Sequence, residues 1–240
     1  MQLNQQSVMV TGATGFIGGR LVRRLVQEER ASVRALVRNV DKADGLVSIG
    51  VEVEQGDVND PDAIRRAMKG CEIVFHCAAV VHNFQATPDL LRRVNVEGTR
   101  NMLAAASAAG VGRFVHLSSI GVYGISPREG TEEADPQQLC GDPYCDSKIE
   151  AERLVLAQAE QKRLPVVIIR PANVYGPRSS FWTLGLLDMI KAGNIKLIDD
   201  GNGMSNHVYI DNLVDAVLLA VRNDTAAGEA FIVSDGANTP

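Results

Sequence analysis

Short apolar segments alternate along the chain with longer segments of helical periodicity. The apolar segments are rich in valine and isoleucine and meet glycine or small residues, which is typical of strands buried on both faces of a sheet. We expect strands at residues 8–10, 32–37, 51–55, 72–79, 113–118, 166–170 and 231–236, and the fourth of these runs into a small-residue turn. We expect helices at residues 18–26, 61–68, 90–109, 144–161 and 211–221, with Asp60 and Asp211 as caps of the second and the last.

Repeated strand–helix units predict the fold class. Near-continuous apolar strands separated by helices favour an α/β architecture, in which a parallel sheet is covered by helices on both faces. Ligands of such sheets bind beyond the carboxyl ends of the strands, where the strand order reverses. The residues that carry chemistry should therefore lie directly after strands.

Composition narrows the class of protein. A chain of 240 residues with 45% hydrophobic and 22% charged residues suits one globular domain, or one domain with a small lobe. A net charge of −5 provides no basic surface for nucleic acid. No segment is long enough for a membrane span and the polar start MQLNQQ is unlike a signal peptide, so we expect no membrane partner and a cytoplasmic location. The four cysteines lack zinc spacing, so we expect no metal site and reduced thiols.

A glycine-rich turn, TGATGFIG, follows the first predicted strand and precedes the first predicted helix. Three glycines at intervals of three allow a tight turn, and the helix N-terminus behind them favours a pyrophosphate. The spacing differs from the common G-x-G-x-x-G fingerprint, and a plain structural turn is the alternative interpretation. We expect a dinucleotide cofactor to contact Gly12, Thr14, Gly15, Phe16, Ile17 and Gly18.

Arg38 follows the second predicted strand. Proteins that bind NAD usually carry an acidic residue about 20 positions beyond the glycine turn, where it bonds the ribose hydroxyls. A guanidinium instead matches a 2′-phosphate in bidentate fashion, so Arg38 favours NADP. NAD stays open because Asp41 could reach the ribose, and Arg38 could also be a solvated surface residue.

Tyr144 and Lys148 stand four positions apart in a predicted helix, so both side chains can face one cleft. A nearby ammonium stabilises a phenolate and lowers the pKa of the phenol towards a value useful for proton transfer. Ser119, directly after a predicted strand, can donate a hydrogen bond to a substrate oxygen. We therefore predict a catalytic group of Ser119, Tyr144 and Lys148, in which Lys148 also bonds the nicotinamide ribose.

Three motifs, TGATGFIG, SSIGVYG and YCDSK, occur in an order that resembles the extended short-chain dehydrogenase/reductase family. The chain is similar to epimerase/dehydratase-like members near the dihydroflavonol reductases and hydroxysteroid dehydrogenases. The resemblance implies a Rossmann-type doubly wound sheet, with residues 1–175 as the dinucleotide-binding domain. Residues 176–240 would form a small, incomplete C-terminal substrate lobe, interleaved with the last elements of the core. The resemblance also implies that the chain forms a homodimer.

The resemblance carries over further site positions. The family's acidic–apolar pair, its H-x-A-A turn, its N-V-x-G-T helix motif and its R-P-x-N-V-Y-G-P segment all have counterparts here. These imply cofactor contacts at Asp57, Val58, Ala78, Ala79, Asn95, Tyr144, Lys148, Pro171 and Val174. The substrate is expected beside Val81, His82, Ser119 and Asn173. His76 is expected to be structural.

The predicted function is an NADP(H)-dependent oxidoreductase that moves a hydride to or from a carbonyl or hydroxyl carbon of a small organic substrate. One alternative is a nucleotide-sugar epimerase or dehydratase that uses NAD, although such enzymes usually carry an acidic residue in place of Arg38. A second alternative is a non-catalytic dinucleotide-sensing protein. The apolar segments 80–84 and 181–187 favour a hydrophobic substrate over a nucleotide sugar.

Overall fold

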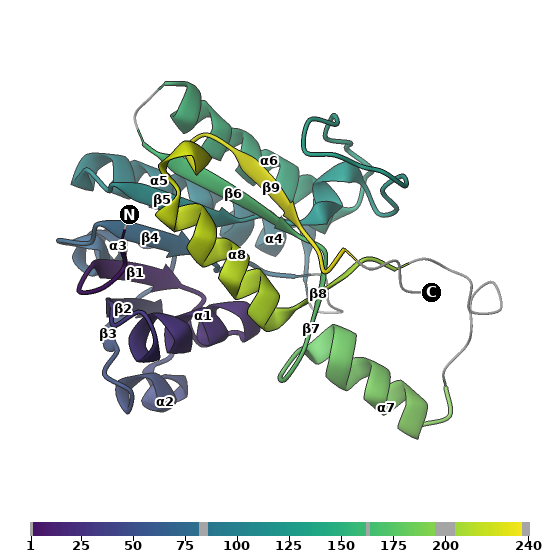
Figure 1. Ribbon diagram of the computed structural model, residues 1–240, viewed down its shortest axis with the longest axis horizontal. Helices are drawn as coiled ribbons and strands as arrows, with labels where there is room; N and C mark the ends of the chain where they lie inside the picture. The colour runs from purple at the N-terminus through teal and green to yellow at the C-terminus, as the bar shows by residue number, and fades with distance from the viewer. Residues whose placement is uncertain (1, 82–85, 162–163, 195–204, 237–240) are drawn as a thin grey trace.

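Figure 1 shows the computed structural model of the chain, which describes residues 2–81, 86–161, 164–194 and 205–236. A seven-stranded sheet in the order β3-β2-β1-β4-β5-β6-β9 forms its centre, and all neighbouring strands are parallel. The strands are β1 (Ser7–Thr11), β2 (Ser32–Val37), β3 (Glu52–Gln55), β4 (Ile73–His76), β5 (Arg113–Leu117), β6 (Val166–Pro171) and β9 (Ala230–Val233). The strand order reverses at β1, so the expected doubly wound α/β fold is confirmed.

Helices cover both faces of the sheet (Figure 1). One face carries α1 (Phe16–Gln27) and α8 (Ile210–Arg222), which pack against each other. The other face carries α3 (Pro61–Met68), α5 (Gly98–Ala109) and α6 (Pro143–Glu160). Alternate residues of each strand point into the two layers: Val8 and Val10 pack towards α1, and Met9 packs towards α3 and α5. Two apolar layers therefore enclose the sheet. Shorter helices are α2 (Asp44–Val47), α4 (Pro88–Leu91) and α7 (Leu186–Lys191).

The helix predicted at 90–109 is not a uniform α-helix. It runs from α4 through a π-helical turn, Arg92–Glu97, into α5. π-Helical turns are rare and often stand at functional sites. Asn95, a predicted site residue, lies in this turn and is buried.

Two short strands lie outside the central sheet. β7 (Asn173–Tyr175) pairs in parallel with β8 (His207–Tyr209), and Val174 stands opposite Val208. The sequence predicted only a turn after Pro171, because the partner strand lies far along the chain and leaves no local pattern. The strand expected within residues 72–79 ends at His76, and residues 77–79 leave the sheet, in agreement with the small-residue turn predicted there.

The two aspartates predicted as helix caps have different roles. Asp60 caps α3, because its carboxylate accepts hydrogen bonds from the backbone of Asp62 at 3.0 Å and of Ala63 at 3.1 Å. The prediction for Asp211 is wrong, since α8 begins at Ile210 without a side-chain cap. Asp211 lies instead in the first turn of α8 and forms an ion pair with an arginine of α1.

We expect Asp60→Ala to lower the free energy of unfolding by about 1 kcal/mol, because two backbone N–H groups of α3 lose their acceptor. Asp60→Ser keeps a capping oxygen and should recover most of the loss. Urea unfolding followed by circular dichroism measures both variants. Equal stability of the alanine variant and the unchanged chain would contradict the capping role.

Candidate active site

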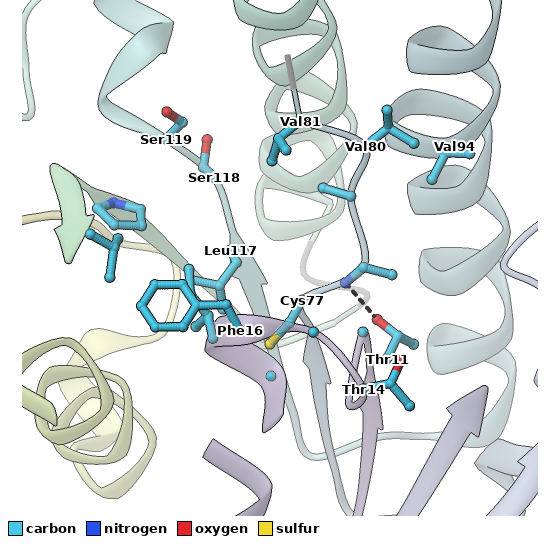
Figure 2. Close-up of a pocket in the computed structure, with 18 of the residues that line it drawn as sticks. Thr11, Thr14, Phe16, Cys77, Val80, Val81, Val94, Leu117, Ser118 and Ser119 are labelled. Carbon is cyan, nitrogen blue, oxygen red and sulfur yellow. Dashed lines mark hydrogen bonds between the residues drawn. The ribbon is translucent and has the colours of Figure 1, made fainter. Parts of the chain in front are cut away.

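A cleft of about 590 Å³ opens at the carboxyl edge of the sheet, at the reversal of the strand order. Figure 2 shows that it extends from Thr11 and Thr14 of the glycine turn, past Cys77, to Ser118 and Ser119 after β5. The segments that follow β1, β2, β3, β4, β5 and β6 all contribute to its wall. This is where ligands of doubly wound sheets bind.

Most residues predicted for the site line this cleft. They are Gly12, Thr14, Gly15, Phe16, Ile17, Gly18, Arg38, Asp57, Val58, Ala78, Ala79, Val81, Ser119, Tyr144, Lys148, Pro171, Asn173 and Val174. Asn95 lies behind the lining at 2% exposure, and its amide bonds the backbone N–H and carbonyl of Val80 at 2.8 and 3.0 Å. Asn95 therefore shapes the cleft through a lining segment. His82 lies outside the described residues.

Two glycines of the glycine turn have no room for a side chain. The φ of Gly12 is +70°, and a Cβ there would lie 2.8 Å from the backbone carbonyl carbon of Cys77. A Cβ on Gly18 would lie 2.3 Å from the Gly12 carbonyl oxygen. α1 begins directly behind this turn, with Gly15 at its N-cap, no side-chain cap and no acidic residue in its first turn. The N–H groups of that turn are therefore available to an external anion, so a dinucleotide pyrophosphate fits here.

A buried chain of hydrogen bonds ties the glycine turn to β4 and α5. The Thr99 hydroxyl donates to the Asn95 carbonyl at 2.6 Å, so it accepts from His76 Nε2–H at 3.0 Å. The other ring nitrogen, Nδ1, then accepts from the Thr11 hydroxyl at 2.8 Å, and that hydroxyl accepts from the backbone of Ala78 at 3.1 Å. Burial lowers the pKa of His76 to about 3, so the ring is neutral. This agrees with the structural role predicted for it.

His116 is a second buried histidine and stands opposite His76 in the register of β4 and β5. The two ring centroids are 5.7 Å apart. Burial, together with the nearby Lys148 charge, lowers the pKa of His116 well below its usual value. Neither ring nitrogen of His116 has a hydrogen-bond partner among the described residues. Both histidines are therefore neutral in the folded chain.

We expect the free energy of unfolding to fall as the pH drops below about 6.5, the pKa of an exposed histidine. The folded pKa values of His76 and His116 lie below the unfolded value, so unfolding takes up protons in this range. His76 contributes stability above about pH 6.5 that is lost as the pH falls towards about 3, by about 1.4 kcal/mol per pH unit. The contribution of His116 is lost in the same direction, because burial lowers its pKa well below the usual value.

Urea unfolding at several pH values between about 7.5 and 5 measures this slope. His116→Leu removes one of the two groups and should reduce the slope by about half. An unchanged slope in that variant would contradict the neutral, buried state of His116.

The predicted catalytic residues, Ser119, Tyr144 and Lys148, line the part of the cleft that follows β5. Asp142 caps α6 by accepting from the Cys145 backbone at 2.9 Å, which places Tyr144 in the first turn. Burial raises the pKa of Tyr144, and a hydrogen bond with Ser119 opposes this shift. The site thus brings a phenol and a serine hydroxyl into contact.

Lys148, one helical turn further along α6, is 3% exposed. Its ammonium donates to the Leu117 carbonyl at 2.5 Å. Burial lowers the pKa of Lys148 to about 8, while the charge of Glu152 raises it. The lowering of the Tyr144 pKa that we expected from Lys148 is not seen: burial raises this pKa, and Lys148 is not among the groups that shift it.

The other end of the cleft carries the groups predicted for the adenosine part of the cofactor. Arg38 lies exposed at the end of β2, and Asp57 and Val58 follow β3. The Asp57 carboxylate is held within its own turn by the backbone N–H and the amide of Asn59, at 2.9 and 2.8 Å. Asp41 is not among the lining residues, so Arg38 and Asp57 are the charged residues that line this end of the cleft.

Some lining residues were not predicted as site residues. The sequence signal for most of them is their position beside a predicted motif; they include Thr11, Leu36, Val37, Gly56, Cys77, Val94, Leu117, Ser118, Ala172, Ser179 and Ser180. Val80, Phe181 and Trp182 belong to the segments predicted as apolar lining. The rings of Phe181 and Trp182 meet edge to face with centroids 5.0 Å apart. This part of the cleft thus has an aromatic wall. Ile120 extends the lining after Ser119.

Comparison with known proteins gives the family. Residues 8–234 match the profile of the NAD dependent epimerase/dehydratase family. The chain is 35% identical over 238 residues to the UDP-glucose 4-epimerase of Vibrio cholerae, a match that covers 96% of this chain and 71% of the epimerase. It is 32% identical over 243 residues to the 3 beta-hydroxysteroid dehydrogenase/Delta 5-->4-isomerase of Mycobacterium tuberculosis (strain CDC 1551 / Oshkosh), covering 95% of this chain and 64% of that protein.

Among solved structures, the chain is similar to DesIV, the dTDP-glucose 4,6-dehydratase of Streptomyces venezuelae with NAD and TYD bound. The TM-score is 0.84 at 27% identity, and the match covers 95% of this chain and 75% of DesIV. The three comparisons thus span 64% to 75% of the length of each similar protein.

The chain belongs to the NAD-dependent epimerase/dehydratase family, and the resemblance to extended short-chain dehydrogenases is confirmed. The chain is therefore an enzyme. The family and the NAD bound to DesIV both support a nicotinamide dinucleotide as the cofactor. Over the described residues, none of the helices combines the length and the apolar character needed to cross a membrane. In the same residues, no three or more His, Cys, Asp or Glu side chains gather as metal ligands.

Proposed function

We propose that this chain is an NADP(H)-dependent oxidoreductase, which moves a hydride to or from a carbonyl or hydroxyl carbon of a small organic substrate. The observation that carries the proposal is the meeting of Ser119, Tyr144 and Lys148 in the same cleft as the uncapped first turn of α1. The first turn of α1 can hold a pyrophosphate, and the hydroxyls of Ser119 and Tyr144 can transfer a proton.

The residues present fit the cofactor. The glycine turn and the first turn of α1 would hold the pyrophosphate, Arg38 would bind a 2′-phosphate, and Lys148 would bond the ribose. When bound, the nicotinamide supplies or accepts the hydride. The protein contributes the position of the substrate and the path of the proton.

The roles of the catalytic residues follow from their contacts. Tyr144 gives its phenolic proton to the substrate oxygen during reduction and takes it back during oxidation. Ser119, which shares a hydrogen bond with Tyr144, donates to the same oxygen and orients the reacting carbon. The buried ammonium of Lys148 stabilises the negative charge that develops when the phenol loses its proton.

A nucleotide-sugar epimerase or dehydratase that uses NAD is the second candidate. The named activities of the Vibrio epimerase and of DesIV favour it. Two features of this chain favour the oxidoreductase instead: Arg38 stands where an acidic residue would hold the NAD ribose, and Val81, Phe181 and Trp182 form an apolar wall. A non-catalytic dinucleotide sensor would not need the hydrogen-bonded pair of Ser119 and Tyr144 beside Lys148.

Calorimetric titration with NADPH and, separately, NADH tests the cofactor. We expect NADPH to bind at least about tenfold more tightly, because Arg38 pairs with the 2′-phosphate. Arg38→Gln should remove this preference, whereas Arg153→Gln, which removes an exposed arginine of α6, should keep it. Tighter binding of NADH would favour the epimerase or dehydratase alternative, and binding of neither would contradict a cofactor role.

Tyr144→Phe tests the catalytic role. We expect turnover to fall by about 100-fold or more while NADPH affinity stays the same, because the phenylalanine removes only the proton-carrying hydroxyl. NADPH oxidation with a panel of hydrophobic ketones and aldehydes measures turnover. Tyr175→Phe removes a hydroxyl outside the lining of the cleft and is the control. Full activity of Tyr144→Phe would exclude the proposed mechanism.

A further inference from the structure

A buried pair of opposite charges lies next to the catalytic group. Glu152 follows Lys148 by one helical turn on α6, so the two side chains share a face, and Glu152 is 0% exposed. It forms an ion pair with Arg170 of β6, which is also buried. Burying two charges is costly unless further hydrogen bonds satisfy them.

Those further hydrogen bonds are present. The Ser118 hydroxyl donates to Glu152 Oε2 at 2.6 Å, and the Gln137 amide donates to Oε1 at the same distance. Arg170 Nε lies 3.1 and 3.2 Å from the two carboxylate oxygens, and its Nη2 also donates to Oε1. The guanidinium lies over the ring of Tyr123, 5.2 Å from its centroid, and bonds its hydroxyl. The carboxylate is therefore held in one position.

The groups around this carboxylate are chain neighbours of the site. Ser118 directly precedes Ser119, and Arg170 directly precedes Pro171, both at the wall of the cleft. The carboxylate itself stands one turn from the catalytic lysine. Three elements that each carry a site residue are thus joined through one buried side chain, Glu152.

We propose that Glu152 is a positioning residue for the reaction, whose carboxylate fixes Ser118, and with it the Ser119 hydroxyl, relative to the catalytic helix α6. Figure 2 shows Ser118 and Ser119 as successive residues at the end of β5, so a shift of the first displaces the second. The inference rests on the proposed oxidoreductase function, because it assigns a means of holding that catalytic group together.

Glu152 also sets the charge around Lys148. The titratable groups that face the ammonium from the packed elements are His76 of β4, His116 of β5 and Cys77 after β4, and all three are neutral at pH 7. Burial lowers the pKa of Lys148 to about 8, and the carboxylate of Glu152 opposes that shift. Without the carboxylate the pKa of Lys148 falls further, and its ammonium loses the proton closer to neutral pH.

NMR titration of the full chain, labelled with ¹³C at the lysine Cε atoms, tests the effect on charge, and Lys148→Met identifies the signal. Glu152→Gln should lower the midpoint of Lys148 by about one pH unit or more. The control is Glu150→Gln, on the same helix as Glu152. It removes a partly exposed carboxylate, whose Oε2 lies 3.7 Å from Arg92 Nε, and should leave the midpoint of Lys148 unchanged. An unchanged midpoint in folded Glu152→Gln would overturn the role in setting charge.

Ser118→Ala tests the positioning without leaving a buried charge unpaired. It should reduce kcat for NADPH-dependent ketone reduction about tenfold or more at unchanged NADPH affinity, and Ser118→Thr should restore it. Gln137→Ala removes a hydrogen bond of equal length to the same carboxylate, outside the lining of the cleft. It should keep kcat, because Arg170 still holds the carboxylate and the bond from Ser118 to it remains. Equal losses in both variants, or no loss in either, would overturn the positioning role. If the unchanged chain reduces no ketone, the proposed function fails, whereas the Lys148 titration still decides the effect on charge.

Discussion

All strands of the central sheet run in one direction, and this constraint decides where chemistry can take place. Each segment that follows a strand leaves at the same edge, so residues far apart in the sequence meet there. The segments after β1 and β4 part at the reversal of strand order, and the cleft lies between them. At Gly12 the two segments lie so close that any side chain would push the end of β1 away from Cys77.

The layer between the sheet and helices α5 and α6 contains polar groups that ordinary cores exclude. His76, His116, Lys148 and the pair of Glu152 with Arg170 are all buried there. Most of these groups have defined partners, and a satisfied polar network makes its surroundings rigid. The same groups reduce the tolerance of this region to change, since removing one partner leaves another buried group without its hydrogen bond.

The sequence predicts the central sheet well because most of its strands are short apolar segments with a glycine or polar residue at their end. Arg38, Ser119 and the glycine turn could be assigned for the same reason, since each follows a strand directly. The predictions that failed depended on distant partners. Asp211 resembles a cap in sequence, yet it pairs with Arg20 of another helix. The strand β7 exists only because β8 lies beside it. In the same way, the burial of Tyr144, which raises its pKa, cannot be read from a four-residue spacing.

The π-helical turn at 92–97 affects how this chain should be aligned with related sequences. A π-helical turn accommodates one residue more than the α-helical turn that it replaces. A relative with an unbroken α-helix at this position would be one residue shorter, and the gap belongs inside the helix, where alignment methods place gaps least readily. An alignment without that gap would displace every residue on one side of the turn by one position. Asn95 would then be compared with a neighbour that points about 100° away around the helix axis.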